Sequence, residues 1–208
     1  MKQLVKTSRA VGLLEKIYRQ LNIDKFDGEL EEPVITIQSS PHVHGHVTCA
    51  KVWQAGNTTR YELNIGAETI NRPIENVVST LLHEMVHIYN LMHGIQDCSR
   101  GNTYHNKKFK EKAESVGLVI NYDKRIGWSI TSPSEELIDY IIAQGWQDIL
   151  ISRSTHARIS SPGVSTPGGK NKTSSTRKYI CPCCGMSVRA TKQVNIVCGD
   201  CGETMQTA

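Results

Sequence analysis

The segment from residue 74 to residue 92 restricts the fold more than any other part of the chain. Apolar residues recur there at α-helical spacing and form one continuous face: Ile74, Val77, Val78, Leu81, Leu82, Met85, Ile88, Tyr89 and Met92. A helix this apolar has to lie in the core, with other elements packed on it. Asn71 can cap its start, Pro73 suits its first turn, and Gly94 can end it.

The same helix carries the pattern H-E-x-x-H at His83, Glu84 and His87. Residues four apart lie one turn apart on one helix face, so the two imidazoles can bind one cation. Glu84 is not in line to be a ligand, and its carboxylate lies where it can take a proton from water at the metal. The pattern therefore predicts a catalytic zinc site with Glu84 as general base.

A catalytic zinc normally has three protein ligands and one open position, and two histidines compete for the third place. His93 gives the spacing H-E-x-x-H-x-x-x-x-x-H, with Asn90 where metzincins have Gly. The apolar pattern continues through residues 91–92, however, and a continued helix carries His93 past the metal. His105 follows a loop rich in Gly and Asn and enters a new helix that can fold back on the first. We favour His105 and keep His93 as the alternative.

The remaining periodicity predicts an α+β domain around this helix. Helices are expected at 8–22, 105–116 and 133–144, and strands at 34–38, 43–53 and 60–65. His42, His44 and His46 alternate along the second strand and so share one face. A second metal site there is conceivable, but polar strand surface near a cleft is the better interpretation.

Five of the seven cysteines lie in residues 181–201, in a pattern typical of metal ligands. Two C-x-x-C-G motifs supply Cys181, Cys184, Cys198 and Cys201. Four thiolates fill a tetrahedral zinc completely, so this zinc is expected to be structural. Cys183 does not reproduce the spacing that the two motifs share. Short strands are expected around Val188, Val194, Ile196 and Val197, which gives a zinc ribbon that depends on its metal for folding.

Charge is distributed unevenly along the chain. Residues 1–148 carry 16 Lys and Arg against 18 Asp and Glu, whereas residues 149–199 carry eight basic residues and no acidic one. A basic tail on a near-neutral body favours a polyanionic partner, and DNA is the first candidate. A solvated linker explains the charge equally well. The expected nucleic-acid contacts on the ribbon are Arg177, Lys178, Arg189 and Lys192.

The order of elements and two motifs resemble a known family. One motif is Leu81-Leu82-His83-Glu84-Met85-Val86-His87, and the other is Tyr104-His105-Asn106-Lys107-Lys108-Phe109. Both are similar to those of SprT-like metallopeptidases, a group that includes Spartan, a DNA-dependent protease of DNA-crosslinked proteins. The resemblance covers about residues 8–130 and implies a zincin-like domain. It also implies zinc on His83, His87 and His105, with Glu84 as base, although Asn106 stands where the family often has Gly.

Three regions are therefore expected: a SprT-like domain at 1–152, a flexible Ser-, Gly- and Pro-rich linker at 153–178, and a zinc ribbon at 179–208. The expected function is a zinc endopeptidase that cleaves DNA-associated proteins, with Tyr104 or Arg100 as an oxyanion helper. The alternatives are a non-catalytic zinc- and nucleic-acid-binding adaptor, and a zinc hydrolase with another substrate. Without an apolar leader or an apolar span, we expect a cytoplasmic monomer, free of membrane contact and able to associate with the nucleoid.

Overall fold

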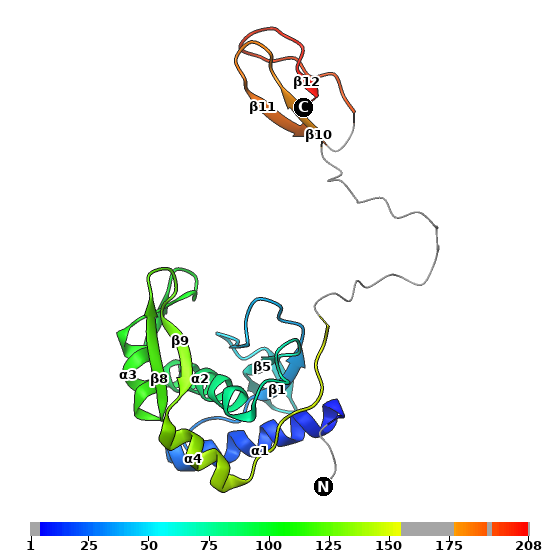
Figure 1. Cartoon of the computed structure of the whole chain (residues 1–208). Helices are drawn as coiled ribbons and strands as arrows, with labels where there is room; N and C mark the ends of the chain where they lie inside the picture. The colour runs from blue at the N-terminus through cyan, green and yellow to red at the C-terminus, as the bar shows by residue number, and fades with distance from the viewer. Residues whose placement is uncertain (1–4, 155–176, 191–192, 208) are drawn as a thin grey trace. The chain divides into compact units, whose positions relative to one another are not determined.

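The computed structural model describes residues 5–154, 177–190 and 193–207, and the chain forms two compact units, Met1–Arg158 and Ile159–Ala208 (Figure 1). Most of the predicted linker lies at 155–176, outside the described residues, as does Lys192. Each unit is described by itself below.

The first unit mixes four helices with small sheets, as expected of an α+β domain. Its helices are α1 (Thr7–Phe26), α2 (Ile74–Met92), α3 (Lys107–Ser115) and α4 (Glu135–Gln144). Its first strands are β1 (Val34–Gln38), β2 (Gly45–Val47), β3 (Trp53–Ala55), β4 (Thr58–Arg60) and β5 (Glu62–Gly66). The later strands are β6 (Cys98–Ser99), β7 (Tyr104–His105), β8 (Leu118–Asp123) and β9 (Gly127–Pro133).

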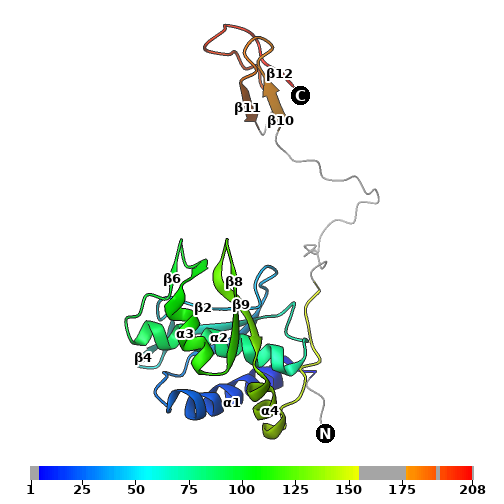
Figure 2. The same cartoon turned by 60° about the vertical axis from the view of Figure 1, so that its left-hand side comes forward.

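The strands form two main sheets on either side of α2. In the first, β5 lies between β1, to which it is parallel, and β2, to which it is antiparallel. In the second, the order is β6-β7-β9-β8, and β3 and β4 form a separate hairpin. Figures 1 and 2 show α3 and the β8–β9 hairpin on one side of α2, with α1 beneath it. The helix that carries the H-E-x-x-H pattern is thus enclosed by the rest of the unit.

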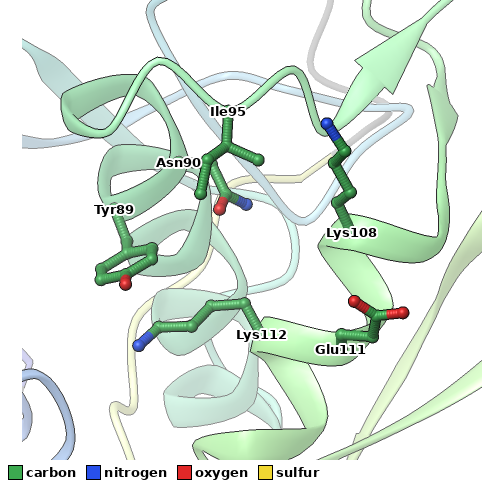
Figure 3. A pocket seen from close by; sticks show the side chains of 6 residues that line it. All are labelled: Tyr89, Asn90, Ile95, Lys108, Glu111 and Lys112. Atoms are coloured by element: carbon green, nitrogen blue, oxygen red, sulfur yellow. The ribbon is translucent and has the colours of Figure 1, made fainter.

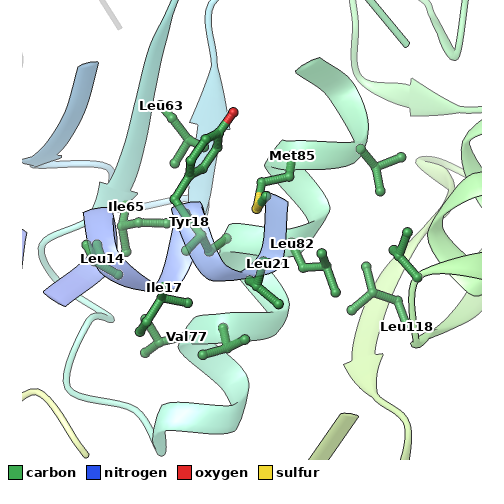
Figure 4. Packing of buried hydrophobic residues seen from close by; sticks show 14 of the residues in the cluster. Leu14, Ile17, Tyr18, Leu21, Leu63, Ile65, Val77, Leu82, Met85 and Leu118 are labelled. Carbon is green, nitrogen blue, oxygen red and sulfur yellow. The ribbon is translucent and has the colours of Figure 1, made fainter. Parts of the chain in front are cut away.

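The core forms where α1 and β5 meet the apolar face of α2 (Figure 4). Every expected apolar position of α2 up to Ile88 is buried, and Tyr89 and Met92 are partly buried against the same core. Leu14, Ile17 and Leu21 of α1 are fully buried against it. The helix predicted at 8–22 is confirmed and is slightly longer than predicted. It continues to Phe26 and ends where Asp27 adopts a left-handed φ of 54°.

The start of α2 differs from the prediction. The helix begins at Ile74 with Pro73 as its N-cap residue, and Asn71 does not cap it. The Ile74 amide donates instead to the carboxylate of Asp148, at 2.8 Å. A distant residue therefore supplies the cap, which local sequence spacing cannot predict. At the other end the prediction is confirmed, since Gly94 follows the helix with a left-handed φ of 64°.

The strand predicted at 43–53 is wrong for most of its length. Only Gly45–Val47 pairs with β5, and the chain leaves the sheet before β3 begins at Trp53. His42 and His44 therefore lie outside the strand, and the alternation expected for the three histidines does not exist. The segment predicted at 60–65 is also divided, because Arg60 ends β4 and Glu62 begins β5.

The β8–β9 hairpin is the largest element that the sequence interpretation missed. Leu118 and Ile120 are buried while Val119 is exposed, which is the alternation of a half-buried strand. Helix α3 begins after His105, and α4 begins after Ser134, whose hydroxyl accepts from the Leu137 amide. Both helices are therefore slightly shorter at their starts than predicted.

The second unit contains β10 (Arg177–Ile180), β11 (Ser187–Ala190) and β12 (Gln206–Thr207), in the order β11-β10-β12. Val188 lies in β11, and Val197 forms an isolated bridge with Thr204. Val194 and Ile196 lie outside strands, although the Ile196 carbonyl accepts from the Met205 amide. None of the described helices of the chain is both long enough and apolar enough to span a bilayer.

Candidate metal centre

Three imidazoles converge beside α2. The Nε2 atom of His105 lies 3.2 Å from Nε2 of His83 and 3.1 Å from Nε2 of His87. Nitrogen ligands at about 2.0–2.1 Å from a tetrahedral zinc are about 3.3 Å apart. The observed separations are close to that value, so the three side chains fit one zinc ion.

The outer nitrogens of two rings fix their tautomers. His87 Nδ1 lies 2.7 Å from a carboxylate oxygen of Asp97, and an ionised carboxylate only accepts. His83 Nδ1 lies 2.8 Å from Thr131 Oγ1, whose own proton goes to the Ser129 carbonyl. Both Nδ1 atoms therefore carry the proton, and both Nε2 atoms turn a lone pair to the common point. Such outer hydrogen bonds orient metal-binding histidines in general.

The environment also keeps the rings of His83 and His105 neutral. Burial, helped by the neighbouring histidines, lowers the pKa of His83 well below its usual value. Burial likewise lowers the pKa of His105 to about 4. Burial raises the pKa of Asp97, but hydrogen bonds from His87 and Asn90 outweigh it, so the net pKa is lowered and the carboxylate is ionised. Neutral imidazole is the form that binds a metal.

Phe109 of α3 forms the floor of this centre. Its ring centroid lies 4.5 Å from that of His83, 4.7 Å from that of His87 and 4.6 Å from that of His105. The side chain is fully buried. Because one rigid ring contacts all three imidazoles, it restricts the directions in which they can turn.

Glu84 lies beside the three histidines, on the same helix. It is 5% exposed, and burial raises its pKa to about 7, against the opposing effects of His87 and of a hydrogen bond from the Val47 amide. A side chain at Gly45 of β2 would come within 3.3 Å of the Glu84 carboxylate and 2.9 Å of Thr80. The absence of a side chain at residue 45 therefore leaves room for the glutamate.

His105 is positioned by its own backbone. In β7 the His105 amide donates to the Ile126 carbonyl at 3.0 Å, and His105 pairs with Gly127 of β9. Gly127 has a left-handed φ of 72°, and a Cβ there would overlap the His105 carbonyl. Asn106, in the position where Gly often occurs in the family, caps α3 by accepting from the amides of Lys108 and Phe109.

The alternative ligands lie elsewhere. His93 caps the end of α2, where its ring stacks on Tyr89 at 4.1 Å and its Nδ1 lies 2.8 Å from the Tyr89 carbonyl. His44 Nδ1 lies 3.2 Å from the Thr69 hydroxyl. Within the described part of the chain, His42, His44 and His46 do not form a metal-binding group.

The role of Asn90 beside the metal centre was not foreseen from the sequence. Asn90 is 1% exposed and its Nδ2 donates to Asp97 at 2.9 Å, so it supports the carboxylate that holds His87. Figure 3 shows Asn90 in the wall of a pocket of about 450 Å³ between α2 and α3, with Lys112 near Tyr89. The Oδ1 atom of Asn90 has no hydrogen-bond partner among the described residues.

The second unit brings four cysteines together. The sulfurs of Cys181, Cys184, Cys198 and Cys201 lie within 4.8 Å of one another, and Cys183 is outside this group. The distance between Cys184 and Cys198 is 3.7 Å, and tetrahedral zinc with Zn–S of about 2.3 Å requires about 3.8 Å. Backbone N–H groups of residues 183–184 lower the pKa of Cys181 to about 7, which favours its thiolate. These residues also fit zinc.

A buried glutamate beside imidazoles from a central helix and a later strand is the arrangement of a zinc metallopeptidase-like scaffold. Comparison with known families supports this scaffold, because the model of the SprT-like family matches residues 14–127. The chain belongs to the SprT-like family, and the resemblance seen in the motifs is confirmed. No curated protein and no solved structure matches the sequence significantly.

Proposed function

We propose that the protein is a zinc-dependent endopeptidase that acts on DNA-associated or DNA-crosslinked proteins. The observation that supports it most is the buried Glu84 beside three convergent imidazole nitrogens. A scaffold that only bound zinc would need the histidines, and it would not need a carboxylate whose pKa is raised to about 7. The same feature speaks against the alternative of a non-catalytic adaptor.

In this proposal His83, His87 and His105 hold the zinc, which supplies Lewis acidity at the scissile carbonyl. Glu84 accepts a proton from the attacking water and later passes it to the leaving amine nitrogen. A carboxylate beside the metal can perform both transfers, because its deprotonated form accepts a proton and its protonated form donates one. Asp97 and Thr131 keep the outer nitrogens protonated, so the lone pairs stay directed at the metal.

The decisive experiment is Glu84→Gln, which keeps the shape of the side chain and removes the base. The variant should retain full zinc content and lose cleavage of a DNA-bound test protein by at least about 100-fold. His83→Ala is the companion variant, and it should lose one of two zinc ions. Proteolysis by Glu84→Gln at the rate of the parent protein would refute the assignment. Cleavage of a non-peptide ester alone would favour another zinc hydrolase.

The four cysteines complete the proposal with a structural zinc in a C-terminal ribbon, at residues 179–208. Two zinc ions per chain are therefore expected. Cys201→Ser should lose one of them and unfold the second unit, while the histidine centre keeps its zinc. Metal analysis of both variants separates the two sites.

The ribbon is proposed to bring the peptidase to DNA. Lys178 of β10 and Arg189 of β11 face each other directly in the antiparallel pair, and both are exposed. Like charges opposite each other are unfavourable, so an anion bound there would relieve the repulsion. Arg177 and Lys192 belong to the same proposed contact set, with Lys192 outside the described residues.

Recruitment to DNA by the ribbon can be tested separately from peptidase activity. Cleavage of a DNA-bound protein should fall when DNA is omitted or when residues 160–208 are removed. Equal cleavage under all three conditions would refute recruitment while leaving the peptidase assignment intact. The joint variant K178E and R189E should weaken duplex binding and leave zinc content unchanged.

A further inference from the structure

Arg72 is a half-buried cation in the first unit that has no counter-ion. It immediately precedes Pro73, the N-cap residue of α2. The Arg72 Nε donates to the Thr69 carbonyl at 2.8 Å, and the Nη2 donates to the Thr80 hydroxyl at 2.9 Å. Within residues 5–154, Arg72 takes part in no ion pair. The proposed mechanism gives this arginine no role.

The fold leaves part of this guanidinium without partners. Apart from the two N–H groups that donate to Thr69 and Thr80, the guanidinium has no acceptor among the described residues. Burial lowers the pKa of Arg72, because a cation that loses water without gaining a carboxylate is destabilised. A bound anion would offset that penalty and would accept from the remaining N–H groups. An anionic group is therefore the kind of ligand that this position favours.

A short series of contacts connects Arg72 with the proposed general base. Thr80, which accepts from Arg72, stands one helical turn before Glu84 on α2. A Cβ at Gly45 of β2 would lie 2.9 Å from Thr80 Cγ2 and 3.3 Å from the Glu84 carboxylate. Burial and then the charge of Arg72 lower the pKa of His44, the residue before Gly45. The guanidinium therefore lies near the start of β2.

Strand β2 presents a free edge toward α2. In the described part of the chain it is the outer strand of the first sheet, with β5 on its other side, and it lies alongside α2 (Figure 2). The His44 carbonyl and the Thr48 amide bond toward β5, so Gly45 and Val47 turn their backbone groups to the free edge. The Val47 amide bonds to Glu84 across that edge. An extended peptide can pair with such an edge and pass the glutamate.

The position of Arg72 along β2 indicates which part of a bound peptide would reach it. Glu84 accepts from Val47, whereas Arg72 lies near His44. Val47 and His44 are separated by about 10 Å of extended chain, because each strand residue rises by about 3.4 Å. A peptide beside β2 with its scissile bond near Glu84 would therefore bring a side chain about two or three residues away to the guanidinium.

We propose that Arg72 selects protein substrates that carry an aspartate or glutamate about two or three residues from the scissile bond. A carboxylate matches a guanidinium, because the two groups form charge-assisted hydrogen bonds that are often paired. The inference rests on the proposed function and deepens it by naming a specificity-determining residue. On a DNA-bound protein, basic residues contact phosphates, so acidic segments are more accessible to a peptidase.

Peptide hydroxamates give a test that needs no proteolysis. The hydroxamate binds the zinc of the full-length, zinc-loaded protein, and the attached peptide carries glutamate or glutamine about two or three residues away. In one series the peptide precedes the hydroxamate, and in the other it follows. In one of the two series the glutamate peptide should bind about 10-fold more tightly by calorimetry, the lower end for a hydrogen bond to a charged group. Equal affinities for glutamate and glutamine in both series would overturn the proposal.

Variants of Arg72 separate its charge from its structural hydrogen bonds. Arg72→Gln should remove the preference, so that the glutamate and glutamine peptides bind alike, whereas Arg72→Lys keeps the charge and should retain part of it. Arg19→Gln is the matched control, because Arg19 of α1 already pairs with Glu32, and it should keep the full preference. An unchanged preference in Arg72→Gln would overturn the proposal. If urea unfolding then shows lower stability, the role of Arg72 is purely structural.

The outcomes separate this inference from the proposed function. Discrimination between the hydroxamates without cleavage of any protein would support the role of Arg72 while the peptidase proposal fails. Cleavage of DNA-bound proteins without enrichment of acidic residues near the cleaved bonds would overturn the role of Arg72 alone. Weaker oligonucleotide binding by Arg72→Gln, with equal affinities for the two kinds of hydroxamate, would also overturn it, in favour of a phosphate contact.

Discussion

Substitution of Gly127 by alanine tests whether the third histidine is positioned by its backbone. Gly127 pairs with His105 between β9 and β7. A Cβ at this residue would overlap the His105 carbonyl oxygen and lie 3.1 Å from both its carbonyl carbon and its amide nitrogen. An ordinary contact of carbon with a carbonyl oxygen is about 3.3 Å, so the strands must separate by about 1 Å.

The expected loss of folding stability in Gly127→Ala has two parts. The left-handed φ of 72° costs an alanine about 1–2 kcal/mol, and the steric overlap adds about 1–3 kcal/mol. A shift of about 1 Å also exceeds the tolerance of about 0.2 Å in metal–ligand distances. We therefore expect zinc affinity at the histidine centre to fall at least about 100-fold, comparable with the largest losses from outer hydrogen-bond partners.

Unfolding in urea, followed by tryptophan fluorescence, reports both effects because the tryptophans lie in the first unit. Zinc at 100 times the parent dissociation constant stabilises the parent by about 2.7 kcal/mol, but a variant with 100-fold weaker binding gains only about 0.4 kcal/mol. Gly145→Ala is the control, since Gly145 has a φ of 65° and nothing within 4 Å of the added Cβ. It should lose about 1–2 kcal/mol and keep the full zinc effect. The reasoning is wrong if Gly127→Ala shows the same zinc effect as Gly145→Ala.

Three further substitutions test other parts of the first unit. Asp97→Asn should weaken zinc binding about 10- to 100-fold in a chelator competition, because His87 loses a charged acceptor; unchanged affinity would exclude this role. Phe109→Ala should destabilise the unit by about 3–5 kcal/mol in urea even without zinc, since the side chain is fully buried; a loss seen only with zinc would contradict core packing. Asp148→Ala removes the remote cap at Ile74 and should cost about 0.5–2 kcal/mol without changing zinc affinity, so any zinc effect would contradict a purely capping role.

Helix α2 and its motif could be predicted because their signals are local. The apolar spacing of residues 74–92 repeats over five turns, so tertiary contacts reinforce a structure that the segment already favours. Helical geometry then fixes His83 and His87 on one face. Gly94 ends the helix as expected, with the left-handed φ that glycine adopts at little cost.

What the sequence could not supply depends on contacts between distant segments. Asp148 caps a helix that begins 74 residues earlier. Thr131 reaches His83 from the β8–β9 hairpin, which was missed although Leu118 and Ile120 alternate with exposed residues. Gly45 is required because Thr80, the Asn64 carbonyl and Glu84 all lie within 3.3 Å of the place that a Cβ would occupy. No spacing rule connects such pairs, since each depends on how separate elements pack.

The choice between His93 and His105 shows why the motif alone does not make the site. His93 is nearer in sequence, but its place at the end of α2 directs its ring onto Tyr89. His105 reaches the other two histidines because its strand pairs with β9, which begins at Gly127. The family match ends at residue 127, yet Thr131 lies beyond it and orients His83. A chain shortened before the β8–β9 hairpin would keep H-E-x-x-H intact and would lose both the outer partner of His83 and the support of His105.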